Sequence, residues 1–62
     1  MVSTVKISSY LEGIEFPVTK EQILAYAEGR GAPADVLNAL QNMRGGKFYT
    51  MAGIWDATGA AA

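Results

Sequence analysis

The sequence predicts an all-α fold, a compact bundle of three to four short helices formed by residues 1–62 as one small domain. Apolar residues recur at helical spacing in three segments, residue types that start helices precede those segments, and glycines follow them. A chain of 62 residues buries only about 60% of the surface that its unfolded form exposes. Each signal that starts or ends a helix therefore carries a noticeable share of the stability.

A first helix is predicted to begin at Ser3 and to end at Gly13. Its apolar stripe follows the spacing i, i+3, i+4 and i+7. The stripe consists of Ile7, Tyr10, Leu11 and Ile14. Residues 14–17 are expected to form an extended connector, because the residue before a proline is biased away from the helical region. Phe16, which precedes Pro17, is expected to point into the core.

The second helix has the most complete start signal. Thr19 is the predicted N-cap, and Gln22 is its partner in a capping box. Val18 and Ile23 have the spacing of a hydrophobic staple. The helix is expected to span residues 20–28. Its inward-facing residues are expected to be Ile23, Leu24 and Ala27.

Local signals also mark the end of the second helix and both ends of the third. Gly29 or Gly31 is expected to take the left-handed position that follows the second helix. The third helix is predicted from Pro33 in its first turn, Asp35 near its positive end, and Arg44 in its last turn before a glycine pair. One face is expected to carry Val36, Leu37, Leu40 and Met43, and the opposite, solvated face Asn38, Gln41 and Asn42.

A weaker fourth helix is predicted after the glycine pair. Thr50 is its expected N-cap, and Tyr49 and Ile54 are placed to form a staple. Gly53 in its first turn costs up to about 1 kcal/mol relative to alanine. The last residues, 59–62, carry no large side chain and are expected to fray.

Composition narrows the classes of function. Five basic and six acidic residues give a net charge of −1, which provides no positive field for nucleic acid. The chain lacks cysteine and histidine, the two commonest metal-ligand types, so we expect no metal and no cofactor. Apolar runs are far shorter than the roughly 20 residues that span a bilayer. We therefore expect a cytoplasmic protein without membrane contact and without a small-molecule substrate.

The order of several short motifs resembles a family of short bacterial proteins, the domain of unknown function twenty-seven ninety-five. The resemblance is carried by residues 10–17, 19–21, 26–27, 31–32 and 36–37, by Leu40 and by Tyr49. It implies a compact all-helical fold and a bacterial origin, and it brings no activity or binding residues. The chain departs from the family pattern at residues 44–48 and then at Gly53 and Trp55.

Three motifs suggest chemistry but have a structural interpretation that we prefer. Ser3 and Lys6 have the Ser-x-x-Lys spacing of penicillin-binding enzymes, yet the partner motifs are missing and Ser3 is a natural N-cap. Glu12 and Glu15 flank a glycine-containing turn, where paired carboxylates are usually solvated. The glycine-rich segments 29–31 and 44–48 are too short for a phosphate-binding loop, and glycine caps of helices explain them. We therefore expect no catalytic residues and no enzyme.

Two classes of function remain. We prefer a protein-interaction module, a homodimer or an accessory subunit, whose candidate partner-contact residues are Phe48, Tyr49 and Trp55. The alternative for these three aromatic residues is that they complete the core. The other class is DNA binding by a helix-turn-helix-like arrangement of the second and third helices. Its groove-facing residues would be Asn38, Gln41, Asn42 and Arg44.

Overall fold

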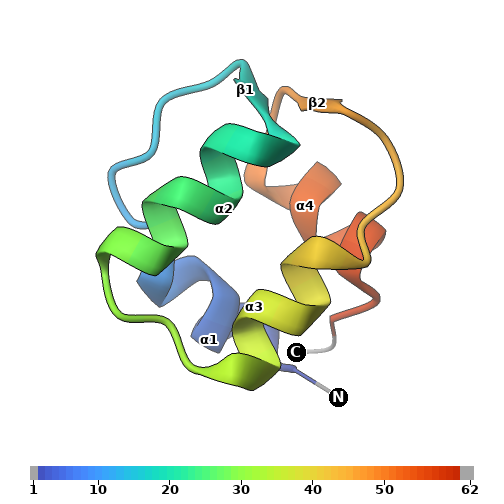
Figure 1. The fold of residues 1–62 in the computed structure, drawn as a ribbon. Coiled ribbons are helices and arrows are strands. Elements are labelled where there is room, and N and C mark those ends of the chain that lie inside the picture. Colours follow the sequence, from blue (N-terminus) through green and yellow to red (C-terminus); the bar gives the residue numbers. More distant parts are fainter. Residues whose placement is uncertain (1, 61–62) are drawn as a thin grey trace.

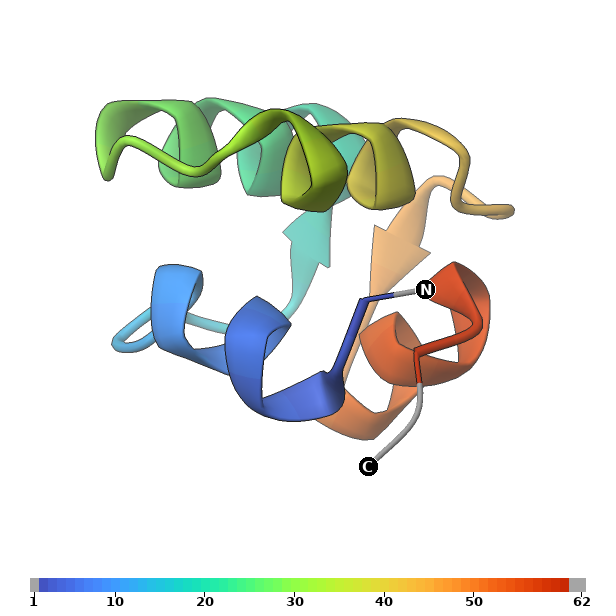
Figure 2. The ribbon, with the colours of Figure 1, turned by 90° about the horizontal axis from the view of Figure 1, so that it is seen from below.

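Residues 2–60, which the computed structural model describes, form four helices and a two-stranded antiparallel sheet. The elements in chain order are α1 (Thr4–Tyr10), β1 (Val18–Thr19), α2 (Lys20–Gly29), α3 (Ala34–Gln41), β2 (Lys47–Phe48) and α4 (Met51–Thr58) (Figure 1). Helices α2 and α3 form one layer, α1 and α4 form the other, and the strands run between the two layers (Figure 2). The fold is therefore mostly helical.

The sheet corrects the all-α prediction. Strand β1 pairs with β2, with Val18 opposite Phe48 and Thr19 opposite Lys47. The Lys20 amide continues this connection by donating a 3.1 Å hydrogen bond to the Gly46 carbonyl. Strands of two residues are too short to show an alternating apolar pattern, so sequence periodicity gave no sign of them.

The predicted start of α2 is confirmed in detail. The Thr19 hydroxyl accepts from the Gln22 amide at 3.2 Å, and the Gln22 side-chain oxygen accepts from the Thr19 amide at 2.9 Å. Val18 and Ile23 are both buried, as the staple requires. Ser3 caps α1 and Thr50 caps α4, each through a 3.1 Å bond from the amide three residues later.

Several predicted helix ends are wrong. Helix α1 ends at Tyr10, before Gly13. Helix α3 ends at Gln41, so Arg44 lies beyond its last turn, and Pro33 occupies the N-cap position without a capping side chain. The prediction for the end of α2 is confirmed: Gly31 takes the left-handed conformation, with φ +76°, and the Ala32 amide donates to the Ala27 carbonyl at 3.0 Å.

The predicted staple of α4 is also wrong. Tyr49 is 67% exposed, whereas Phe48 and Ile54 are buried. Strand β2 explains this, because neighbouring residues of an extended segment point to opposite sides, and Phe48 is the one that faces inward.

The predicted fraying concerns residues 59–62. Within the described part, the Ala60 amide donates to the Trp55 carbonyl at 3.1 Å, and residues 61–62 lie outside it.

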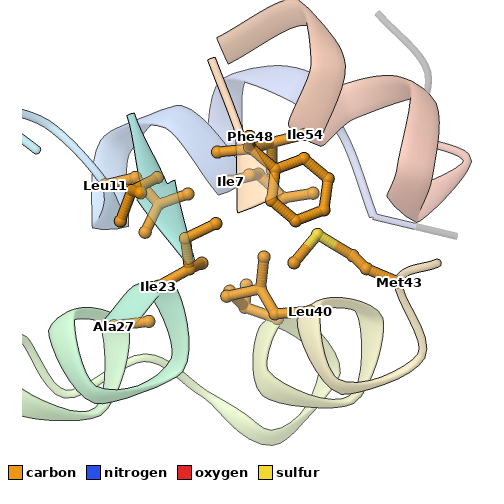
Figure 3. Packing of buried hydrophobic residues seen from close by; sticks show 10 residues of the cluster. Ile7, Leu11, Ile23, Ala27, Leu40, Met43, Phe48 and Ile54 are labelled. Atoms are coloured by element: carbon orange, nitrogen blue, oxygen red, sulfur yellow. The ribbon is translucent and has the colours of Figure 1, made fainter. Parts of the chain in front are cut away.

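The core lies between the two layers of helices and receives side chains from both and from the strands (Figure 3). Its buried residues are Ile7, Leu11, Val18, Ile23, Ala27, Val36, Leu40, Met43, Phe48 and Ile54. Most of the predicted inward faces are therefore confirmed. The predicted inward residues Tyr10, Ile14, Phe16, Leu24 and Leu37 are only partly buried and pack against the outside of this core.

Replacing Thr19 by alanine is expected to lower the free energy of unfolding by about 1 kcal/mol, because the Gln22 amide loses its capping partner. Urea denaturation measures this loss. Gln41→Ala, which changes an exposed side chain, is the matched control and should stay close to the wild type. Equal stability of the Thr19→Ala and Gln41→Ala variants would contradict the role of the cap.

Gly13→Ala is expected to lower the free energy of unfolding by roughly 1–2 kcal/mol, because Gly13 has a positive φ. Its φ is +86°, and a Cβ atom there would lie 3.2 Å from the Tyr26 hydroxyl, which donates to the Glu12 carbonyl at 2.6 Å. In Gly46→Ala, the control, the new Cβ has nothing within 4 Å. If urea midpoints of the two variants coincide, the turn imposes no requirement for glycine.

Candidate functional site

A surface groove with a volume of about 500 Å³ runs between α1 and α4. We call it the α1–α4 groove. It is lined by Thr4, Val5, Ser8, Ser9, Glu12, Met51 and Trp55. Helix α1 turns Ile7 toward the core, as does Leu11 at its C-cap, and this places the small hydroxyl residues of α1 beside α4. The small size of these residues leaves the groove open next to the larger side chains of α4.

Trp55 forms one wall of the α1–α4 groove and is held in place by a hydrogen bond. Its Nε1 donates to the Ser8 hydroxyl at 3.0 Å, joining two residues that are 47 positions apart. The indole is only partly buried, so one part packs on the core while another part faces the groove. A buried or half-buried indole N–H usually needs such a partner. The bond therefore fixes an apolar ring on the surface in one orientation.

Val5 and Met51 complete the apolar part of the groove. Val5 is 75% exposed and Met51 is partly exposed. Neither residue is among the site residues expected from the sequence. The sequence does contain a signal for the exposure of Val5. This apolar residue does not lie on the helix face of Ile7 and Leu11, so packing in the core does not explain it. Met51 precedes Trp55 by four residues, the spacing of neighbours on one helix face.

The structure separates the three aromatic residues that were candidates for partner contact. Phe48 is 7% exposed and belongs to the core. Tyr49 is 67% exposed, and the Lys47 ammonium lies 5.8 Å from the centre of its ring. Trp55 lies in the α1–α4 groove. Of these three rings, Tyr49 and part of Trp55 are therefore exposed, whereas Phe48 is not.

The polar residues proposed to face DNA are all exposed. Asn38 and Gln41 lie on α3, and Asn42 follows directly after it. Arg44 lies outside the helix, so it does not share a regular helix face with the amide side chains. Asp35 lies in the first turn of the same helix.

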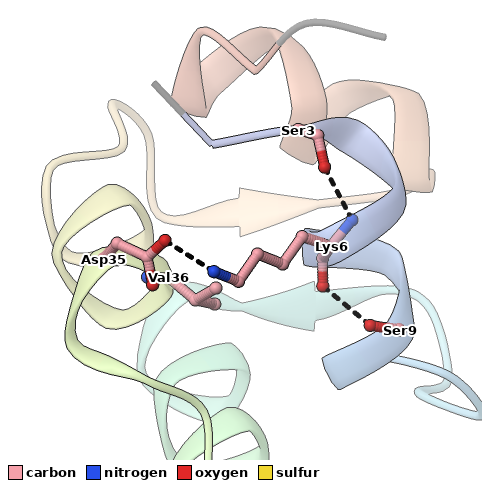
Figure 4. Close-up of polar contacts among 5 residues, drawn as sticks. All are labelled: Ser3, Lys6, Ser9, Asp35 and Val36. Atoms are coloured by element: carbon pink, nitrogen blue, oxygen red, sulfur yellow. Dashed lines mark hydrogen bonds and ion pairs between the residues drawn. The ribbon is translucent and has the colours of Figure 1, made fainter.

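The Ser-x-x-Lys spacing serves the structure of α1. The Ser3 hydroxyl accepts from the Lys6 backbone amide at 3.1 Å, while the Lys6 ammonium points away to Asp35 on α3 at 2.8 Å (Figure 4). The Ser9 hydroxyl donates to the Lys6 carbonyl at 3.0 Å. The lysine amine thus contacts a carboxylate of the other helix layer, and the serine hydroxyl contacts a backbone amide.

The ion pair shifts the pKa of both of its members. The hydrogen bond from Lys6 lowers the pKa of Asp35 below its ordinary value of 3.8, helped by the Val36 amide, which donates to the carboxylate at 2.9 Å. The same hydrogen bond raises the pKa of Lys6 above 10.5. Both side chains are about half exposed, so solvent screens the pair and its contribution to stability is small.

Glu12 and Glu15 are both exposed. Within residues 2–60, no three acidic side chains gather closely enough to hold a metal ion. None of the described helices has both the length and the apolar character needed to cross a membrane.

The contribution of Asp35 to stability is expected to be present at neutral pH and to be lost as the pH falls through its lowered folded-state pKa. The urea midpoint of the wild type should exceed that of Asp35→Asn at neutral pH, and the two should converge below the lowered folded-state pKa, where both states of the wild type bind the proton. The difference should also shrink in a Lys6→Gln background. A pH-independent difference would show that the lowered pKa is not the cause.

Comparison with known proteins gives a family and no function. Residues 2–55 match the family model described as a protein of unknown function (DUF2795), which includes every element up to Trp55 in α4. No curated protein and no solved structure has a significant match to the chain. The family model covers the two layers, the strand pairing and all residues that line the α1–α4 groove. The chain therefore belongs to the family of proteins of unknown function DUF2795.

Proposed function

We propose that this protein is a non-catalytic protein-interaction module and that its α1–α4 groove receives apolar side chains of a partner. The single observation that carries this proposal is the exposure of Val5, at 75%, beside the partly exposed Met51 and Trp55. Burial of apolar surface contributes roughly 25 cal/mol per Å². A partner that covers these three side chains gains that free energy without unfolding any part of the groove.

The construction of the groove favours binding over a purely structural role. The Ser8 hydroxyl holds the Trp55 indole at 3.0 Å, so the ring is ordered before a partner arrives. Ordering a flexible side chain on binding costs about 0.5–1.5 kcal/mol, and a preordered ring avoids part of this cost. Tryptophan is also the residue type most enriched among those that dominate binding energy at interfaces.

The polar groups around the groove suit a protein partner. Ser9 and Glu12 are exposed at its edge, where a hydroxyl and a carboxylate can pair with polar groups of the partner. An apolar centre with a polar edge is the usual arrangement of protein interfaces. Ser3 and Lys6, the one pair with catalytic spacing, are engaged in the helix cap and in the ion pair with Asp35.

Photo-crosslinking from position 5 tests this function. Benzoylphenylalanine replaces Val5 in one variant and Ala25, an exposed residue of α2 in the other layer, in the matched control. After irradiation in an extract of the native host, position 5 is expected to give discrete adducts and position 25 none. Excess unlabelled wild-type protein should suppress the adducts formed with other proteins of the extract, and excess Val5→Asp protein should not, because a charge in the groove opposes apolar binding.

Equal labelling from positions 5 and 25 would contradict the proposal, as would suppression by the Val5→Asp competitor as effective as that by the wild type. The substitutions at positions 5 and 25 change exposed side chains. These variants should therefore unfold at the same urea concentration as the wild type.

A further inference from the structure

We infer that the occupant of the α1–α4 groove is a second copy of this chain, which inserts its Tyr49 ring and places its Lys47 ammonium near Glu12. This inference rests on the proposed interaction function and specifies its partner. It concerns two surfaces that the structure places on each molecule: the groove, and the pair formed by Lys47 and Tyr49.

The Lys47–Tyr49 pair is a cationic aromatic projection. Phe48 is buried, and because side chains alternate along an extended segment, Lys47 and Tyr49 project together on the outer side. The Lys47 ammonium lies 5.8 Å from the ring centre, within the range of a cation–π contact. Tyr49 is 67% exposed and, with Val5, is one of two large hydrophobic residues that residues 2–60 leave exposed. A tyrosine is also a common anchor of protein interfaces.

The groove is complementary to this projection in both polarity and charge. Its apolar surface, formed by Val5, Met51 and Trp55, suits an aromatic ring. The charged residue that lines it is Glu12. The groove therefore presents a carboxylate, whereas the projection carries a positive charge. Complementary charges of this kind favour one orientation of binding and oppose others.

The position of the two surfaces favours a closed pair. Tyr49 precedes Met51 by two residues, so projection and groove lie next to each other on one molecule. A twofold axis near the start of α4 would let each copy insert its projection into the groove of the other, which makes the contact self-complementary. A net charge of −1 per chain leaves little repulsion between two copies.

Charge reversal tests the inference on the intact chain. In sedimentation equilibrium up to millimolar concentration, the wild type is expected to form a reversible dimer, and Tyr49→Ser should weaken it at least about tenfold, as loss of a central aromatic anchor does. Glu12→Lys and Lys47→Glu should each weaken dimerisation up to about fivefold, the range of exposed charge pairs. An equimolar mixture of these two variants should associate more tightly than either alone, because both contacts of the mixed dimer then join opposite charges, whereas both contacts of each variant's own dimer join like charges.

The matched control is Glu28→Lys, which makes the same charge change on the exposed end of α2 and should leave the dimer intact. A wild type that stays monomeric at millimolar concentration overturns the inference. Equal weakening of the dimer by Glu12→Lys and Glu28→Lys would also overturn it, as would a dimer that is equally strong in Tyr49→Ser and the wild type. In that event, adducts from position 5 with a mass other than twice the chain would still support the interaction function, so the two proposals fail separately.

Discussion

The pairing of residues 18 and 19 with β2 is the contact on which the rest of the fold depends. Val18 lies opposite Phe48 in the sheet and is buried in the same core cluster as Ile23, which lies in the first turns of α2. Thr19 lies opposite Lys47 and is also the N-cap of α2. Two consecutive residues therefore tie the layer of α2 and α3 to the segment that leads into α4.

The same pairing determines the surface that we propose for binding. Because Phe48 faces the core, Lys47 and Tyr49 face outward, and α4 follows directly from Thr50, which caps it. The start of α4 then places Ile54 in the core and Trp55 against Ser8 of α1. The inward orientation of Phe48 in β2 thus determines both the groove and the position of the Lys47–Tyr49 pair.

Features formed by residues close together in the sequence could be predicted, and contacts between distant residues could not. The capping box of Thr19 and Gln22 depends on residues three positions apart, so their types and spacing suffice to predict it. The strand pairing joins residues about thirty positions apart through backbone groups, which carry no sequence signal when each strand has two residues. For the same reason the sequence predicts the staple at Tyr49, although Phe48 is the buried neighbour. The groove was missed because it depends on how α1 and α4 meet, whereas Trp55 was identified from its residue type alone.

Hydrogen exchange of the Lys20 backbone amide tests the central contact most directly. This amide lies in the first turn of α2, where N–H groups have no partner within the helix and normally exchange fast. Here it donates to the Gly46 carbonyl at 3.1 Å, next to the pairing of β1 with β2. If that pairing holds the layers together, the Lys20 amide should exchange as slowly as amides in the middle of α2, through global unfolding. Exchange as fast as that of the exposed Glu21 amide in the same turn would contradict this account.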